Sequence, residues 1–212
     1  MPTFRLERAL LAANPEAVIA GIDEAGRGPW AGPVVAGAAI LDESSLPREL
    51  RDGLDDSKAL TPARREELFE LLQASSAVHG AVGLAEVHEI DAVNILQATH
   101  FAMARALAAL SQKVDIALVD GNRAPPLDCA VQTVIKGDSL SLSIAAASIL
   151  AKVTRDRVMM QLAAQHPGYG WETNMGYGTP EHNDALKRLG VTVHHRRTFA
   201  PVRAMLFHVA RP

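Results

Sequence analysis

The 212-residue chain contains little of what marks several large protein classes. Its single cysteine, Cys129, cannot form a disulfide within the chain, which is typical of a protein in a reducing compartment. Nowhere does it have an apolar run of about 18 residues, and the apolar stretch 9–13 is too brief for a signal peptide. We therefore expect a cytoplasmic protein with no membrane association.

The chain also lacks an excess of positive charge. Its formal net charge is −3 and its isoelectric point is about 6.2, so bulk electrostatics do not indicate a nucleic-acid-binding protein. An anionic partner would need a local basic patch. Lys152 and Arg155 are three residues apart on an expected helix, so they share a face that could meet phosphates. The alternative is an ordinary solvated face.

Several catalytic motifs are missing as well. The sequence has no GxxxxGK[ST] phosphate loop, no HExxH or paired CxxC of a zinc site, and no GxSxG nucleophile turn. Gly26, Gly28 and Gly32 resemble a dinucleotide fingerprint, but their spacing is wrong and a strand is expected after them. These absences argue against nucleotide-triphosphate, zinc, serine-hydrolase and dinucleotide chemistry.

Hydrophobic patterning predicts an α/β layered domain, a mixed sheet with helices on its faces. We expect strands at 18–22, 34–41, 78–84, 114–119 and 130–135. We expect helices at 62–74, 92–111, 140–164 and 180–189, and a polar loop at 42–60. With 48% hydrophobic residues the chain can bury one core, so a single domain spanning 1–212 is expected.

Acidic residues follow three of the expected strands. The first strand leads into Asp23 and Glu24, the fourth into Asp120, and the fifth is followed by Asp138. Chemistry in such sheets tends to lie beyond the carboxyl ends of the strands. Four carboxylates in one site raise one another's pKa, and a pair of divalent cations such as Mg²⁺ removes that repulsion and supports phosphoryl displacement. Each acid alone is readily explained as a solvated loop residue, but the recurrence favours a metal site.

Tyr177 has glycines on both sides, which deny its ring local packing partners. The ring is therefore a candidate to stack on a ligand or to donate a hydrogen bond to it. A structural tyrosine is the alternative.

A series of ordered motifs gives the sequence a resemblance to a known family. They are GIDEAGRGPWAGPVV at 21–35, LDDSKAL at 54–60, LVDGN at 118–122, VIKGDS at 134–139, AAASILAKVTRD at 145–156, GYGTPEH at 176–182 and HHRRTFAPV at 194–202. In this order they resemble the type 2 ribonucleases H (ribonuclease HII) over nearly the whole chain. The resemblance implies a ribonuclease H-like fold with a mixed five-stranded sheet flanked by helices and a helical C-terminal extension over about 166–212.

The resemblance also implies an activity. Enzymes of this family are metal-dependent endoribonucleases that cut the RNA strand of RNA–DNA hybrids. They also nick on the 5′ side of ribonucleotides embedded in duplex DNA, leaving 3′-hydroxyl and 5′-phosphate ends, by two-metal-ion hydrolysis with Mn²⁺ or Mg²⁺. We expect a monomer. Two alternatives stay open: another metal-dependent nuclease or integrase of the same fold, and a non-catalytic nucleic-acid-binding module.

Site residues follow from the same resemblance, position by position. The catalytic and metal-binding residues would be Asp23, Glu24, Asp120 and Asp138. Contacts to the ribose and its backbone would come from Gly26, Arg27 and Gly28, where a missing Cβ lets the backbone approach closely. Tyr177 would lie near the ribonucleotide–deoxyribonucleotide junction. Ser57, Lys58 and Lys152 would contact phosphates. The family commonly has serine where this chain has Thr198, a conservative change.

Overall fold

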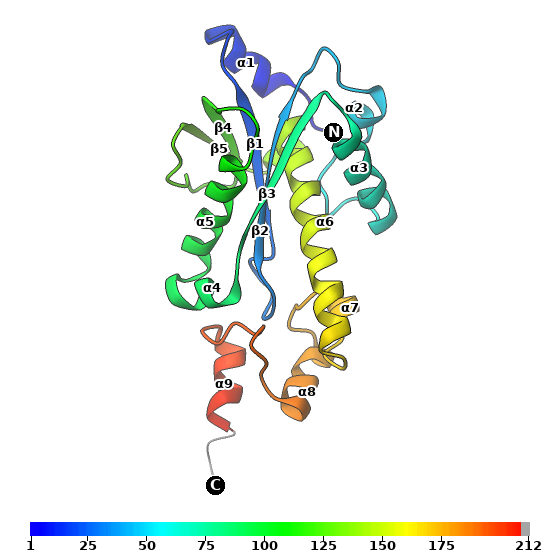
Figure 1. Ribbon diagram of the computed structural model, residues 1–212, viewed down its shortest axis with the longest axis vertical. Helices are drawn as coiled ribbons and strands as arrows, with labels where there is room; N and C mark the ends of the chain where they lie inside the picture. The colour runs from blue at the N-terminus through cyan, green and yellow to red at the C-terminus, as the bar shows by residue number, and fades with distance from the viewer. Residues whose placement is uncertain (209–212) are drawn as a thin grey trace.

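The computed structural model describes residues 1–208, and its centre is one mixed sheet of five strands (Figure 1). The strands are β1 (Ile19–Ala25), β2 (Val34–Leu41), β3 (Val78–Ala85), β4 (Ile116–Asp120) and β5 (Ala130–Val134). Their order is β3-β2-β1-β4-β5, with β1 antiparallel to β2, β2 antiparallel to β3, and β1, β4 and β5 parallel. The α/β fold with a mixed five-stranded sheet is therefore confirmed.

Helices cover both faces of the sheet. They are α1 (Arg5–Ala13), α2 (Arg48–Gly53), α3 (Pro62–Ala74), α4 (Val87–Val93), α5 (Ile95–Ala108), α6 (Leu142–Gln165), α7 (Trp171–Asn174), α8 (Pro180–Leu189) and α9 (Ala200–His208), with a 3₁₀ turn η1 (Gly137–Ser139). Figure 1 shows α4 and α5 on one side of the sheet and α3 and α6 on the other. One hydrophobic core lies between α6, α3 and the sheet, and a second between α5 and the sheet.

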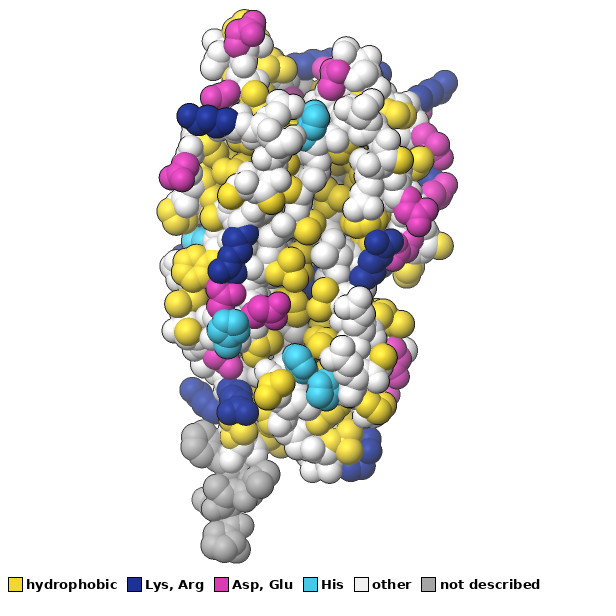
Figure 2. All heavy atoms as spheres, viewed as in Figure 1, with side chains coloured by type: hydrophobic (Ala, Val, Ile, Leu, Met, Phe, Trp, Pro, Cys, Tyr) yellow, Lys and Arg dark blue, Asp and Glu magenta, His cyan; other side chains and the backbone are white. Residues whose placement is uncertain are grey.

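The face over the edge strand β3 carries few charges along its middle. Figure 2 shows hydrophobic and uncharged side chains there, with Lys, Arg, Asp and Glu to either side. No helix within residues 1–208 is both long enough and apolar enough to cross a bilayer.

Some elements differ from the sequence-based expectation. Strand β1 does not end at Ile22 but continues to Ala25, because Glu24 and Ala25 pair with β2. The helix expected at 92–111 is α5, which begins only at Ile95, since Asn94 has φ 76° and its side chain caps α5 by accepting from the Leu96 and Gln97 N–H groups. Helices α1, α2 and α4 were not predicted, and α2 lies within the expected polar loop.

Helix α1 fixes the start of the long helix α6. The carboxylate of Glu7 accepts hydrogen bonds from Ser141 Oγ at 2.6 Å and from the Ser143 backbone N–H at 3.1 Å. An acid at a helix N-terminus satisfies free backbone donors and complements the helix dipole. Because η1 comes directly before α6, this contact also fixes the turn that carries Asp138.

The C-terminal helices gather at the far end of α6 (Figure 1). A third core joins Met159 and Leu162 of α6 to Trp171 of α7 and Leu186 of α8, and it includes Ala31 from the loop between β1 and β2. The extent of the C-terminal extension, expected over about 166–212, stays a prediction, and residues 209–212 lie outside the described part of the chain.

Candidate active site

The sheet topology brings the predicted acids together. Strands β1 and β4 run parallel with Ile22 opposite Val119, so Asp23 and Asp120 follow side by side. The Asp120 carboxylate accepts the Gly137 N–H at 2.6 Å, which ties the end of β4 to the turn bearing Asp138. Strand β1 supplies Glu24 as well, because it continues past Asp23.

These carboxylates influence one another. Burial raises the pKa of Asp23 well above its usual value, and the charges of Glu24 and Asp120 raise it further. Burial also raises the pKa of Glu24, although Arg27 opposes the shift, and burial with the Asp56 and Asp120 charges raises that of Asp138. The site therefore concentrates negative charge in a place where water screens it poorly.

Two basic side chains face this negative charge. Arg27 forms an ion pair with Glu24, at 3.2 Å from Nη1 to Oε1. Partial burial lowers the pKa of Lys58, but the charges of Asp23 and other acids outweigh it and leave the pKa raised. Lys58 thus lies in the electrostatic field of the acids.

A groove of about 420 Å³ begins at Glu24, which alone of the four acids lines it. Every residue predicted to contact substrate lines it, together with Glu24, Arg65 and Arg155. The structure therefore brings the predicted ribose, junction and phosphate contacts to one surface, although Ser57 is 5% exposed and contributes little area.

Gly28 and Tyr177 meet across this groove. The Tyr177 ring is 49% exposed, and a Cβ added to Gly28 would lie 3.4 Å from its Cε1 atom. Gly26 has a different role. Its φ is +96°, and a Cβ there would lie 2.0 Å from Nε of Arg155, inside the protein. Gly26 is therefore required by backbone conformation and internal packing, whereas Gly28 borders the groove.

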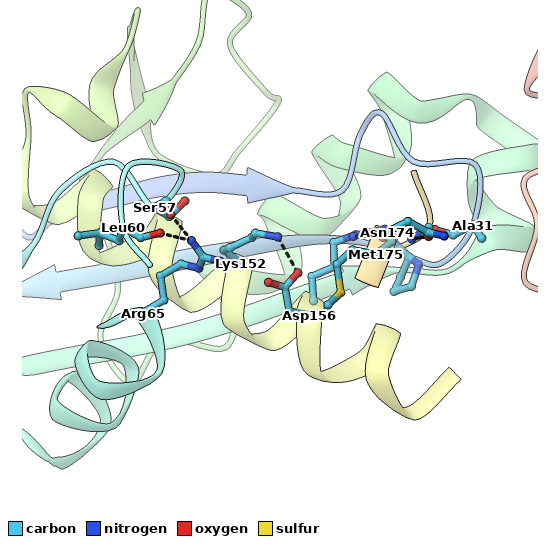
Figure 3. Close-up of polar contacts among 11 residues, drawn as sticks. Ala31, Ser57, Leu60, Arg65, Lys152, Asp156, Asn174 and Met175 are labelled. Carbon is cyan, nitrogen blue, oxygen red and sulfur yellow. Dashed lines mark hydrogen bonds and ion pairs between the residues drawn. The ribbon is translucent and has the colours of Figure 1, made fainter. Parts of the chain in front are cut away.

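One wall of the groove is held by Arg65 of α3. Its Nη1 donates to the carbonyl oxygens of Ser57 and Leu60, at 2.7 and 2.6 Å. Figure 3 also shows Lys152 pointing to Asp156, with which it forms an ion pair at 2.7 Å. A phosphate that binds Lys152 must compete with this acid.

The structure does not place Arg155 on a phosphate-facing surface with Lys152, so that expectation is wrong. The Arg155 side chain is buried, and it donates to the carbonyl oxygens of Ala31, Pro33 and Met175 at 3.0–3.1 Å. Three-residue spacing places both residues on one side of α6, but Arg155 lies nearer the loop between β1 and β2, whose carbonyls need donors.

Two buried histidines support the Tyr177 backbone. His182 Nδ1 lies 2.9 Å from the Tyr177 carbonyl oxygen and must donate to it. His195 Nδ1 accepts the Thr192 N–H at 3.0 Å, so a neutral His195 carries its proton on Nε2. That proton is donated over 3.0 Å to His182 Nε2, which also accepts Trp171 Nε1–H. The network assigns both tautomers, and both rings are neutral.

Sequence reasoning missed several contributors to this site. They are Asp56, Arg65, His182, His195 and Arg196. Asp56, the two histidines and Arg196 lie within quoted motifs, so their position was a usable signal. Nothing in the sequence distinguishes Arg65 from its neighbour Arg64, which pairs with Glu67 on the surface.

The donor set suits a hard divalent cation. Carboxylate oxygens are the ligands that Mg²⁺ prefers. Burial and repulsion disfavour the charged forms of Asp23, Glu24 and Asp138 and raise their pKa values, and a bound cation would stabilise those charged forms. Within residues 1–208, however, no three His, Cys, Asp or Glu side chains form a ready metal site. The Gly137 N–H engages Oδ1 of Asp120 and Arg27 engages Oε1 of Glu24, so each of these two carboxylates keeps a second oxygen for a cation.

Comparison with known proteins gives a consistent result. The family model for ribonuclease HII matches residues 20–202. A ribonuclease HII of Rhodospirillum rubrum is 56% identical over 212 residues, covering 100% of this chain and 95% of the relative. One from Paramagnetospirillum magneticum is 59% identical over 191 residues, covering 90% and 94%. The crystal structure of ribonuclease H2 from Pyrococcus horikoshii has a TM-score of 0.76 and 32% identity, covering 92% of this chain and 99% of that one.

Proposed function

This chain belongs to the ribonuclease HII family, and we propose that it cuts the RNA strand of RNA–DNA hybrids and nicks duplex DNA at embedded ribonucleotides. Membership makes it a metal-dependent ribonuclease H that acts on nucleic acid. The finer proposal is cleavage on the 5′ side of the ribonucleotide, leaving 3′-hydroxyl and 5′-phosphate ends. The observation that carries it is the convergence of Asp23, Glu24, Asp120 and Asp138 beside a groove lined by the predicted substrate contacts.

The acids are proposed to hold two Mg²⁺ or Mn²⁺ ions. When bound, such ions activate a water and stabilise the leaving oxygen in an in-line displacement at phosphorus. Asp23 within β1 and Asp120 at the end of the neighbouring strand β4 lie side by side, and both would serve as metal ligands. Arg27 would release Glu24 for this purpose and become free to meet a phosphate.

Recognition of the ribose is proposed for the part of the groove between residues 26–28 and Tyr177. Only the 2′-hydroxyl separates a ribonucleotide from its deoxy neighbours, so the protein must contact that group. Backbone groups of Gly26, Arg27 and Gly28 border the groove, and the exposed Tyr177 ring lies against Gly28. Lys58, Lys152 and the Ser57 region would bind the flanking phosphates.

A paired cleavage assay tests the proposal. A duplex with one embedded ribonucleotide, an RNA–DNA hybrid and an all-deoxy duplex are incubated with and without Mg²⁺ or Mn²⁺. The wild type should cut the first two only when metal is present. Asp120→Asn should lower the rate roughly 100- to 1000-fold, because a metal-binding charge is lost. The control is Asp184→Asn, since Asp184 is an exposed acid on α8.

Other outcomes identify the alternatives. Equal cleavage of the all-deoxy duplex would indicate another nuclease of the same fold, and binding without cleavage would indicate a non-catalytic module. A folded Asp120→Asn protein with full activity would refute the assignment of the acids.

Tyr177 is tested separately by two substitutions. Tyr177→Phe keeps the ring and removes the hydroxyl, so it should cost about 1 kcal/mol of substrate interaction if the phenol donates a hydrogen bond. Tyr177→Ala removes both and should strongly reduce nicking at a single ribonucleotide while metal titration is unchanged. Wild-type nicking by Tyr177→Ala would make the tyrosine structural.

We further propose that the enzyme acts as a monomer in the cytoplasm.

A further inference from the structure

The loop between β1 and β2, residues 26–33, turns most of its carbonyl groups into the protein. Arg196, fully buried, donates to four of them: Nη2 to Gly26 at 2.5 Å and to Pro33 at 3.1 Å, Nη1 to Arg27 at 3.0 Å, and Nε to Gly32 at 3.0 Å. Arg155, also buried, donates to Ala31 and Pro33. Two buried guanidinium groups therefore satisfy the carbonyl groups that the loop turns inward.

Neither guanidinium has an acidic partner. Among the ion pairs of the described side chains, Arg155 and Arg196 take part in none. Burial lowers the pKa of Arg155 to about 10 and that of Arg196 to about 9, and each remains charged near neutrality. Burying two cations that only carbonyl dipoles compensate costs free energy. This cost is explained if the two arginines hold the loop in its geometry.

The inward carbonyls determine where the amides point. In a trans peptide the C=O of one residue and the N–H of the next lie on opposite sides of the peptide plane. Because the Gly26 and Arg27 carbonyls bind Arg196, the N–H groups of Arg27 and Gly28 point away from it. Among the hydrogen bonds of residues 1–208, neither N–H donates to a protein group, and both residues line the groove.

We infer that Arg155 and Arg196 are positioning residues that hold loop 26–33 with its Arg27 and Gly28 amides presented to the sugar, and so determine how well ribose is distinguished from deoxyribose. The inference rests on the proposed function. Arginine suits this task because its rigid fork offers five donors, while lysine offers one ammonium group that cannot bridge several carbonyls at fixed angles.

Lysine substitutions test the inference without removing charge. Binding is measured in Ca²⁺ for a duplex with one ribonucleotide and for its all-deoxy twin, and the affinity ratio is the readout. Arg196→Lys should lower this ratio about tenfold, as expected for loss of one well-placed hydrogen bond. Arg155→Lys should lower it less, because Arg155 packs against Gly26 but donates no hydrogen bond to the Gly26 or Arg27 carbonyl. Mn²⁺ titration should match the wild type in both.

A matched control separates positioning from general stability. Arg105 binds Glu89 through two nitrogens and also donates to the Leu84 carbonyl, at a surface outside the groove. Arg105→Lys should lower thermal stability without changing the affinity ratio. A ratio that falls equally in this control would mean that the ratio follows stability, and the inference would be wrong.

The remaining outcomes are also decisive. A wild-type ratio near one would overturn the proposed function and this inference with it. A normal wild-type ratio that both lysine variants retain would overturn the inference alone. Should neither variant fold, amide resonances of the wild type decide. The Arg27 and Gly28 N–H signals should shift more with the ribonucleotide duplex than with its all-deoxy twin, and equal shifts would refute the inference.

Discussion

Acidification should destabilise this protein through its buried histidine pair. The His195 ring is fully buried, and both of its nitrogens are already committed, one accepting from Thr192 and the other donating to His182. Burial and the neighbouring histidines lower the pKa of His195 to about 3. In the unfolded chain this pKa is about 6.5. Below that pH the unfolded chain binds a proton that the folded chain refuses, so stability falls as the pH falls toward 3.

The size of the effect follows from the two pKa values. Between about pH 7.5 and about pH 5, His195 alone should lower the free energy of unfolding by about 2 kcal/mol. Burial also lowers the pKa of His182, so its protonation adds to the loss in the same direction. Domains of this kind are stable by about 5–15 kcal/mol, so the change is readily measured.

Urea unfolding at the two pH values measures the loss directly. The wild type should lose about 2 kcal/mol more than His195→Gln on going from the higher to the lower pH. His79→Gln, which alters an exposed ring, is the control and should lose as much as the wild type. An equal loss in His195→Gln and wild type, or a His195 NMR titration near pH 6.5, would refute the reasoning.

Three further predictions follow from the structure, two on stability and one on activity. Gly26→Ala should lower the free energy of unfolding by about 2 kcal/mol or more in urea titrations, because φ is +96° and its Cβ would displace Arg155. Gly28→Ala, the control, should leave stability within about 0.5 kcal/mol. Cys129→Ser should keep nicking activity within a few-fold, and complete loss in a folded variant would reveal a thiol role. Glu7→Ala should cost about 1 kcal/mol in thermal melts, because Ser141 Oγ and the Ser143 N–H lose their acceptor at the start of α6, and no change would contradict this role.

The sheet and its acids could be predicted because their signals are local. Apolar runs such as 34–41 and 114–119 identify buried strands, and acids near the carboxyl ends of parallel strands meet at one edge of the sheet. The length of β1 was not predictable in the same way. Glu24 is a poor strand residue, and it is held in the strand by its pairing with Ala36 of β2, which local sequence does not reveal.

The support beneath the site could not be read from residue type. Arg196 is fully buried against loop carbonyls, whereas the next residue, Arg197, is exposed and offers only its backbone N–H to Asp91. Arg64 and Arg65 differ in the same manner, one on the surface and one holding the Ser57–Leu60 turn. Identical neighbours receive different roles because burial is decided by distant segments.

The loop at residues 26–33 is joined to a segment more than 160 positions later in the chain. Ala31 forms an antiparallel bridge with His195, the Gly32 N–H donates to the His194 carbonyl, and the Arg196 N–H donates to the Trp30 carbonyl. Proteins are synthesised from the N-terminus, so all four acids emerge from the ribosome before these partners exist. A nascent chain thus carries all four acids before it carries the segment that fixes the loop at residues 26–33.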